Sequence, residues 1–309
     1  MKILNTISKN KHLSGADPFM AIGTSVLVTA FVLFTILLPE YSDTLFNNAK
    51  QFIAKNFAWY YILLISILLF LAVFIAFSRY GSLKLGKDNE KPEFSFFAWF
   101  SMLFGAGIGI GILFWSIAEP IYHFQSNPFI SPEQNLSIEA AQVAMRISIF
   151  HWGLHGWAMF AISGLALAYF SYRRGLPLSV RSTLYPILGD KIYGYIGHSV
   201  DMLAIFSTLF GIATSLGLGA QQMNAGFSYL FGLNISITNQ VIIIGTISIL
   251  ATLSVLSGVH KGIKFLSELN MSLTIIILLF FLLLGPTVYL LGAFVTNLGD
   301  YFENFIVLG

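Results

Sequence analysis

Seven long apolar stretches, separated by short polar segments, constrain this chain more than any other feature. Each holds on the order of 20 residues or more, and together they cover residues 19–38, 57–77, 96–121, 143–170, 193–230, 238–257 and 271–295. Only 10% of the residues are charged and 56% are hydrophobic, which is far from the composition of a soluble domain. Within a bilayer, an isolated stretch must be helical because its backbone polar groups need partners inside the segment. The sequence therefore predicts an all-α polytopic membrane protein with about seven transmembrane helices.

Positive charge is distributed unevenly between the loops on the two sides of the predicted membrane. Thirteen of the 16 Lys and Arg residues fall on the same side as the N-terminus, and the other side keeps only Lys50, Lys55 and Arg146. Cytoplasmic loops carry an excess of Lys and Arg. We therefore expect a cytoplasmic N-terminus and an exoplasmic C-terminus. The first apolar stretch has no small-residue cleavage site after it, so we expect it to be a retained span.

The third apolar stretch contains a glycine cluster that a regular membrane helix tolerates poorly. Residues 96–124 read FFAWFSMLFGAGIGIGILFWSIAEPIYHF, with Gly105, Gly107, Gly109 and Gly111 near the middle. Each glycine in a helix interior is about 1 kcal/mol less favourable than alanine, so the cluster disfavours regular helix by about 4 kcal/mol. Two interpretations stay open: close helix packing through small-xxx-small pairs, or unwound backbone that holds substrate or ions near the bilayer midplane. A dinucleotide-binding loop is disfavoured by the apolar residues on both sides.

Ionisable residues within the apolar stretches are few. His151 and His155 share one helix face at i,i+4 spacing, but no carboxylate or third ligand is near them in the sequence. We expect each to hydrogen-bond across a helix interface, and we expect no metal site. Glu119 and Arg146 lie near the outer ends of the third and fourth stretches, where they could pair and close the extracellular side; two separate snorkelling charges are the alternative.

No catalytic arrangement is recognisable in the sequence. A nucleophile with a neighbouring base is lacking, as is a phosphate-binding loop, so we expect neither an enzyme nor an organic cofactor. The chain has no cysteine, which excludes disulfides and thiolate metal sites within it. We expect no nucleic-acid partner.

The fourth apolar stretch, IFHWGLHGWAMFAISGLALAYF, contains an aromatic face. On a single helix, at roughly 100° per residue, Trp157 would lie about 140° and Phe160 about 80° from Trp152, so the three rings would share one broad face. For Trp152, close to the outer end, a place in the interfacial aromatic belt is the alternative. An inward-facing aromatic cluster suits a quaternary ammonium group, which each ring face attracts by about 0.5–2 kcal/mol.

Three long motifs give a family resemblance that covers essentially the whole chain. The segments MLFGAGIGIGILFWSIAEP, FHWGLHGWAMFAISGLALAYFSYRRG and LAIFSTLFGIATSLGLGAQQMNAG, in this order, resemble the betaine/choline/carnitine transporter family. The resemblance implies an inverted-repeat fold with two accessory helices and two five-helix repeats, as in relatives of the sodium-coupled neurotransmitter transporters. It also implies secondary transport of trimethylammonium compounds, driven in many members by the sodium gradient.

The resemblance assigns candidate substrate-binding residues to the glycine stretch and to the aromatic positions of the fourth helix. These are Gly107, Gly109, Gly111, Trp152, Trp157 and Phe160. Phe160 replaces a tyrosine that is often found at its position, so the ring is kept and the hydroxyl is lost. Family members that carry choline tend to have Asp at the position of Gly111. The expected substrate is therefore glycine betaine or a similar zwitterion.

The resemblance also implies sodium as the coupling ion. The backbone carbonyls of Gly105 and Ile108 correspond to sodium ligands of the family, and Thr208 corresponds to a ligand of a second sodium site. Ile212 stands where another threonine would be expected. This substitution removes an oxygen ligand and puts a two-sodium stoichiometry in doubt.

The resemblance divides the chain into four parts: a cytoplasmic N-terminal tail (1–18), two accessory transmembrane helices (19–92), the first five-helix repeat (93–296) and the start of an exoplasmic amphipathic connector (297–309). The second repeat is absent from these 309 residues, and with it the other wall of the aromatic site. We therefore expect a truncated or split sodium-coupled symporter, in a bacterial-type cytoplasmic (inner) membrane, that does not transport as this chain alone.

The alternative is a non-transporting membrane subunit or half-transporter that pairs with a separately encoded second half. A channel is disfavoured because no ring of charged or carbonyl-rich loop residues is evident. The expected partners are the trimethylammonium substrate, the lipid bilayer and, by the resemblance, two further copies in a homotrimer.

Overall fold

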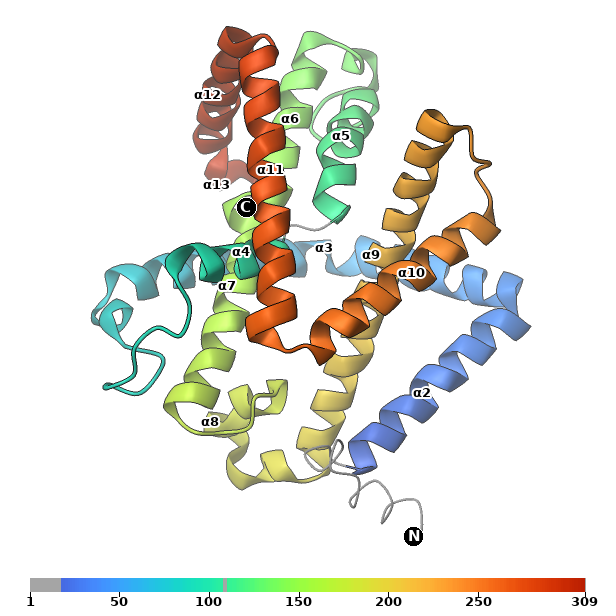
Figure 1. Ribbon diagram of the computed structural model, residues 1–309. Coiled ribbons are helices and arrows are strands. Elements are labelled where there is room, and N and C mark those ends of the chain that lie inside the picture. Colours follow the sequence, from blue (N-terminus) through green and yellow to red (C-terminus); the bar gives the residue numbers. More distant parts are fainter. Residues whose placement is uncertain (1–17, 108–109, 309) are drawn as a thin grey trace. The chain divides into compact units, whose positions relative to one another are not determined.

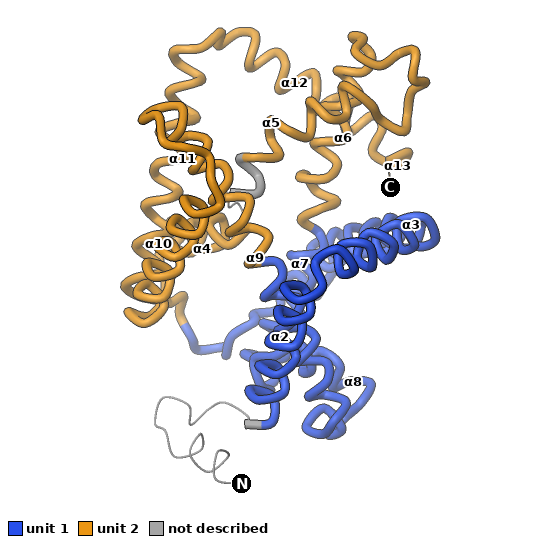
Figure 2. Tube along the Cα trace, turned by 90° about the vertical axis from the view of Figure 1, so that its right-hand side faces the viewer, with its two compact units in different colours: residues 1–90, 158–211 blue, residues 91–157, 212–309 orange. Residues whose placement is uncertain are grey.

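The computed structural model describes residues 18–107 and 110–308, and this part of the chain is helical, with no β-strand (Figure 1). Six helical segments in it are long and apolar enough to cross a membrane, and the apolar helix at 96–107 is shorter. The prediction of an all-α polytopic membrane protein is confirmed. The chain forms two compact units, residues 1–90 with 158–211 (unit 1) and residues 91–157 with 212–309 (unit 2), which Figure 2 distinguishes by colour.

Unit 1 is built from the first two long helices and from the middle of the chain. Its elements are α2 (Pro18–Leu37), α3 (Pro39–Phe77), η1 (Arg79–Ser82), α7 (Leu154–Ala168) from residue 158, the π-helical turn η3 (Tyr169–Arg173), η4 (Val180–Leu184), α8 (Tyr185–Leu188), η5 (Gly189–Tyr193) and α9 (Tyr195–Phe231) as far as residue 211.

Aromatic rings and a close approach join α2 to α9 within unit 1. The Phe31 ring centroid lies 4.5 Å from that of Phe210 and 5.8 Å from that of Phe206, in edge-to-face geometry. A Cβ added at Gly23 would lie 2.8 Å from Met202 Sδ, so the glycine lets the two helices approach. Between membrane helices, close packing of this kind replaces the hydrophobic driving force that lipid does not supply.

A buried carboxylate organises the turn before α9. Asp201 is buried; its Oδ1 accepts the backbone N–H of Arg181 at 2.9 Å, and its Oδ2 lies 3.1 Å from Arg181 Nε. Arg181 Nη1 also lies 3.2 Å from His198 Nδ1. A buried carboxylate is stable only when it is paired and hydrogen-bonded, and this network satisfies that condition.

An ion pair ties the segment after η1 to the end of η3. Arg173 Nη1 donates to Asp88 Oδ1 at 2.7 Å and to the Gly86 carbonyl at 3.0 Å. The Arg173 guanidinium holds the pKa of the Asp88 carboxyl below its ordinary value of 3.8.

This pair predicts a pH dependence of local order. Because the folded pKa of Asp88 is depressed, the stabilisation is present above the ordinary value of 3.8 and is lost as the pH falls through the lower folded value. Backbone amides of residues 84–90 should therefore exchange faster as the pH falls below 3.8, after correction for intrinsic exchange. In Asp88→Asn the corrected rates should not depend on pH in this range, and equal pH dependence in both proteins would contradict the assignment.

Unit 2 contains the glycine stretch and the C-terminal helices. Its elements are α4 (Phe96–Gly107), α5 (Ile110–Gln125), η2 (Pro132–Gln134), α6 (Ile138–Trp152), the start of α7, the second part of α9, α10 (Ile237–Leu256), the π-helical turn η6 (Val259–Ile263), α11 (Lys264–Leu284), α12 (Thr287–Glu303) and α13 (Phe305–Leu308). The fully buried Asn224 joins α9 to the segment before α10, since its side chain donates to the Asn234 carbonyl and accepts from the Ser236 N–H, each at 3.1 Å.

Two apolar stretches expected to be single helices are interrupted, and those predictions were wrong. Stretch 143–170 breaks at Gly153, which has φ −95° and ψ −146°. Stretch 271–295 breaks at Gly285 and Pro286, because a residue before proline disfavours helical geometry and Gly285 is extended (φ −89°, ψ −172°). The longest stretch, 193–230, is not interrupted. It lies almost entirely in α9, which is one continuous helix of 37 residues. At roughly 1.5 Å per residue it exceeds the thickness of the hydrocarbon core.

Candidate functional site

The end of α4 brings the glycine stretch against a tryptophan. A Cβ placed on Gly107 would overlap ring atoms of Trp157, so only glycine fits beside this ring. The indole N–H of Trp157 donates to the Trp152 carbonyl at 2.8 Å, which fixes the ring orientation. The structure therefore brings together Gly107 and Trp157, two of the predicted substrate-binding residues. Ile108 and Gly109 lie outside the described residues, and Gly111 lies in the first turn of α5.

The three aromatic residues do not share one uninterrupted helix. Trp152 ends α6, whereas Trp157 and Phe160 belong to α7. The expected angle between Trp152 and the other two assumed a regular helix through Gly153, so that prediction was wrong. A Cβ at Gly153 would overlap the Ile149 carbonyl, which explains why the break occurs at a glycine. Phe160 belongs to unit 1 and its side chain is well exposed, whereas Trp152 and Trp157 belong to unit 2.

The predicted sodium ligand Gly105 faces polar groups of α11. A Cβ on Gly105 would lie 3.4 Å from Ser267 Oγ and 3.9 Å from Asn270 Nδ2. One turn earlier on α4, Ser101 is fully buried, and its hydroxyl has no hydrogen-bond partner in the described part of the chain. Sequence reasoning missed Ser267 and Asn270. No local pattern in the sequence indicates their contact with α4, because they are two of several polar residues in the first half of α11.

Thr208 is the predicted ligand of the second sodium site, and it lies in unit 1. Its hydroxyl donates to the Ala204 carbonyl of its own helix at 2.8 Å, and its side chain is exposed. This back-bond is common for threonine in membrane helices. The structure thus places Gly105 and Thr208 in different units.

Glu119 and Arg146 do not form an ion pair with each other. Arg146 donates from Nε and Nη2 to the two carboxylate oxygens of Asp300 on α12, at 2.7 and 2.6 Å. Glu119 instead contacts the Nδ1 atom of His151 and accepts the Trp152 indole N–H at 2.5 Å. Arg146 and His151 are five residues apart on α6, about 140° around the helix, so they face different neighbours.

The two histidines of the fourth stretch hydrogen-bond across helix interfaces, as predicted. His155 is buried and its Nδ1 lies 2.9 Å from the hydroxyl of Tyr301 on α12. Its ring centroid also lies 4.5 Å from that of Phe305. His151 contacts Glu119 on α5. No carboxylate near the histidines was expected, but the fold brings Glu119 and also His123 beside His151. The i,i+4 spacing of Glu119 and His123 on one helix was the sequence signal for this cluster.

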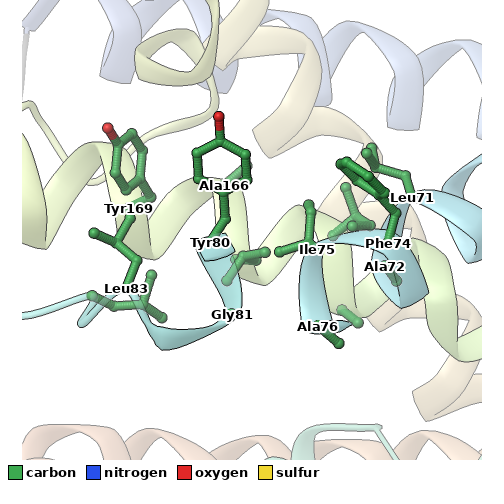
Figure 3. A pocket seen from close by; sticks show the side chains of 14 residues that line it. Leu71, Ala72, Phe74, Ile75, Ala76, Tyr80, Gly81, Leu83, Ala166 and Tyr169 are labelled. Carbon is green, nitrogen blue, oxygen red and sulfur yellow. The ribbon is translucent and has the colours of Figure 1, made fainter. Parts of the chain in front are cut away.

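A separate apolar cavity of about 770 Å³ lies within unit 1, between the end of α3, η1 and α7. Figure 3 shows Tyr169 and Leu83 at one end, Leu71 and Phe74 at the other, and Tyr80 between them. The described lining residues include no charged side chain. No predicted site residue lines this cavity.

Comparison with known proteins agrees with the motifs. The model of the betaine/carnitine/choline family of transporters (BCCT) matches residues 19–309. The chain belongs to this family. BCCT members are transporters rather than enzymes, so the chain is part of a multi-pass membrane transporter family.

Several curated relatives are similar along almost the whole chain. A probable glycine betaine transporter of Desulfitobacterium hafniense is 45% identical over 283 residues, which are 92% of this chain and 56% of the relative. The high-affinity choline transport protein of Escherichia coli K12 is 44% identical over 303 residues, 98% of this chain and 44% of the relative. The glycine betaine transporter OpuD of Bacillus subtilis is 44% identical over 281 residues, 91% of this chain and 54% of the relative. The chain spans about half the length of the BCCT relatives that it matches.

Proposed function

We propose that this chain forms one wall of the substrate site in a sodium-coupled symporter for glycine betaine or a related trimethylammonium osmolyte. The observation that supports this most directly is the packing of Trp157 against Gly107. Gly107 lets the Trp157 ring lie directly against the backbone of the glycine stretch, and the ring offers a π surface to a methylated ammonium. Relatives named as betaine and choline transporters agree with this substrate class.

The sodium part of the proposal rests on α4 and α11. A buried hydroxyl without a partner is costly, and Ser101 is such a group one turn from Gly105. Hard cations prefer oxygen ligands, which the Gly105 carbonyl, the Ser267 hydroxyl and the Asn270 amide would offer. By the charge distribution between loops, the N-terminus would lie in the cytoplasm of a bacterial-type cell.

Binding of radiolabelled glycine betaine to the purified chain in lipid nanodiscs tests this proposal. Unlabelled glycine betaine should compete, whereas glycine, which lacks the methyl groups, should not. Replacing sodium by potassium should weaken binding by about tenfold or more, equivalent to about 1.4 kcal/mol. Equal affinity in the two salts would remove the symporter assignment, and equal competition by glycine would remove the trimethylammonium assignment.

Transport by alternating access requires two repeats that move around a central site. We therefore propose that transport requires the length of chain that the relatives have and that these 309 residues do not cover. Proteoliposomes that contain only these residues should show no sodium-driven betaine uptake above empty liposomes. Uptake that saturates and requires a sodium gradient would refute this part of the proposal, even where binding is as expected.

A further inference from the structure

Glu119, His123 and His151 form a cluster that the proposed transport function does not use. Glu119 Oε1 lies 3.6 Å from His123 Nε2 and also contacts His151 Nδ1. The three potential ligand atoms all lie within 4.8 Å of one another. We propose that this cluster is a binding site for a zinc-like transition-metal ion, held between α5 and the end of α6.

The ligand types identify the class of ion. Two imidazoles and one carboxylate form a common ligand set for three-coordinate protein sites of Zn²⁺, with a fourth position left for water. At bond lengths of about 2.0–2.2 Å, tetrahedral ligand atoms lie about 3.3 Å apart. The 3.6 Å separation of Glu119 Oε1 and His123 Nε2 is close to this value. Two nitrogen donors disfavour Mg²⁺ and Ca²⁺, which prefer oxygen ligands.

The surroundings of the cluster resemble those of a built metal site. Glu119 and His123 lie one turn apart on α5, and His151 lies in the last turn of α6, so two helices position all three. The Trp152 indole N–H donates to Glu119 Oε2 at 2.5 Å, which orients the carboxylate so that Oε1 faces the two histidines. Outer-shell bonds of this kind orient ligands in known sites.

Burial differs between the ligands in a way that permits loading. The side chain of Glu119 is only 9% exposed, and that of His151 is 48% exposed. A buried carboxylate gains from a cation beside it. The half-exposed imidazole leaves a route by which an ion can enter. The alternative occupant is a proton shared between Glu119 and His151, which would leave His123 without a role as a ligand.

Cobalt spectroscopy on the purified chain, with any polyhistidine tag removed, tests the proposal. Tetrahedral Co²⁺ absorbs visible light intensely, so titration should give a saturating band at about one ion per chain, and Zn²⁺ should abolish this band. His123→Ala and His151→Ala should each weaken Co²⁺ binding by at least about tenfold, since loss of even an outer-shell partner costs this much. The matched control is His260→Ala, because His260 is exposed and lies outside the cluster.

A second variant keeps the test decisive if an alanine variant does not fold. The chain has no cysteine, so His123→Cys introduces a single thiolate ligand at the proposed site. Co²⁺ bound there should show a near-ultraviolet thiolate-to-cobalt charge-transfer band that the parent chain lacks. Binding without this band, an unchanged affinity in His151→Ala, or no tetrahedral Co²⁺ in the parent chain would overturn the proposal in favour of a shared proton only. The result does not depend on the substrate that the transporter carries.

Discussion

Asp300→Ala is expected to loosen α12 strongly. In the native chain the Arg146 guanidinium donates two hydrogen bonds to Asp300, and the two side chains are only 22% and 25% exposed. Removing the carboxylate leaves a largely buried cation without its partner. Loss of one member of a buried ion pair lowers the free energy of unfolding by about 3–5 kcal/mol, and loss of an exposed pair lowers it by about 0–1 kcal/mol. Because this pair is partly buried, we expect a loss of about 2 kcal/mol. Amides of residues 287–303 should then exchange roughly 30-fold faster with deuterium.

The control for this variant is an ion pair in the same unit with weaker geometry. Lys264 Nζ lies 3.9 Å from Glu268 Oε1 at i,i+4 spacing, and both side chains are about one third exposed. Glu268→Ala should change stability by less than about 0.5 kcal/mol. Arg146→Lys keeps the charge but loses the forked geometry, so it should fall between the two. Unchanged exchange of α12 in Asp300→Ala would show that the pair does not hold this helix.

The sequence could not predict this pair, although both residues are conspicuous in it. Arg146 and Asp300 are separated by 154 residues, and the pairing depends on how α12 packs against α6. The sequence instead suggested Glu119 as the partner of Arg146, because Glu119 and Arg146 lie near the outer ends of neighbouring apolar stretches. The partner of Arg146 depends on the direction in which each side chain points from its helix. That direction depends on the helix boundaries, which hydropathy does not resolve.

The apolar stretches were predictable because length and composition alone determine whether a helix can span lipid. Their interruptions were harder to predict. Gly153 and Gly285 each lie inside a continuous apolar stretch, and their non-helical backbones become visible only in three dimensions. In the candidate site, the family resemblance assigned Gly107 and Trp157 to one substrate site, and the structure brings these two residues into contact. The contribution of Ser267 and Asn270 depends on the packing of α11 against α4, which no local pattern encodes.

Gly107→Ala is expected to weaken glycine betaine binding by about tenfold or more. The added methyl group would overlap the Trp157 ring, and that ring cannot turn away without breaking its 2.8 Å hydrogen bond to the Trp152 carbonyl. Overpacking of this kind costs about 1–3 kcal/mol, and about 1.4 kcal/mol corresponds to a factor of ten in affinity. The affinity can be measured in the nanodisc binding assay with radiolabelled glycine betaine.

Two further variants separate a local clash from a general effect of alanine. Gly217 lies within α9 and has open space around the position of a Cβ, so Gly217→Ala should leave the affinity unchanged. Trp157→Phe combined with Gly107→Ala should recover part of the affinity, because the smaller ring makes room for the methyl group while keeping an aromatic face. The interaction energy between the two changes should then be favourable and above about 0.5 kcal/mol. Strictly additive losses would show that Gly107 acts on substrate binding by a route other than the Trp157 ring.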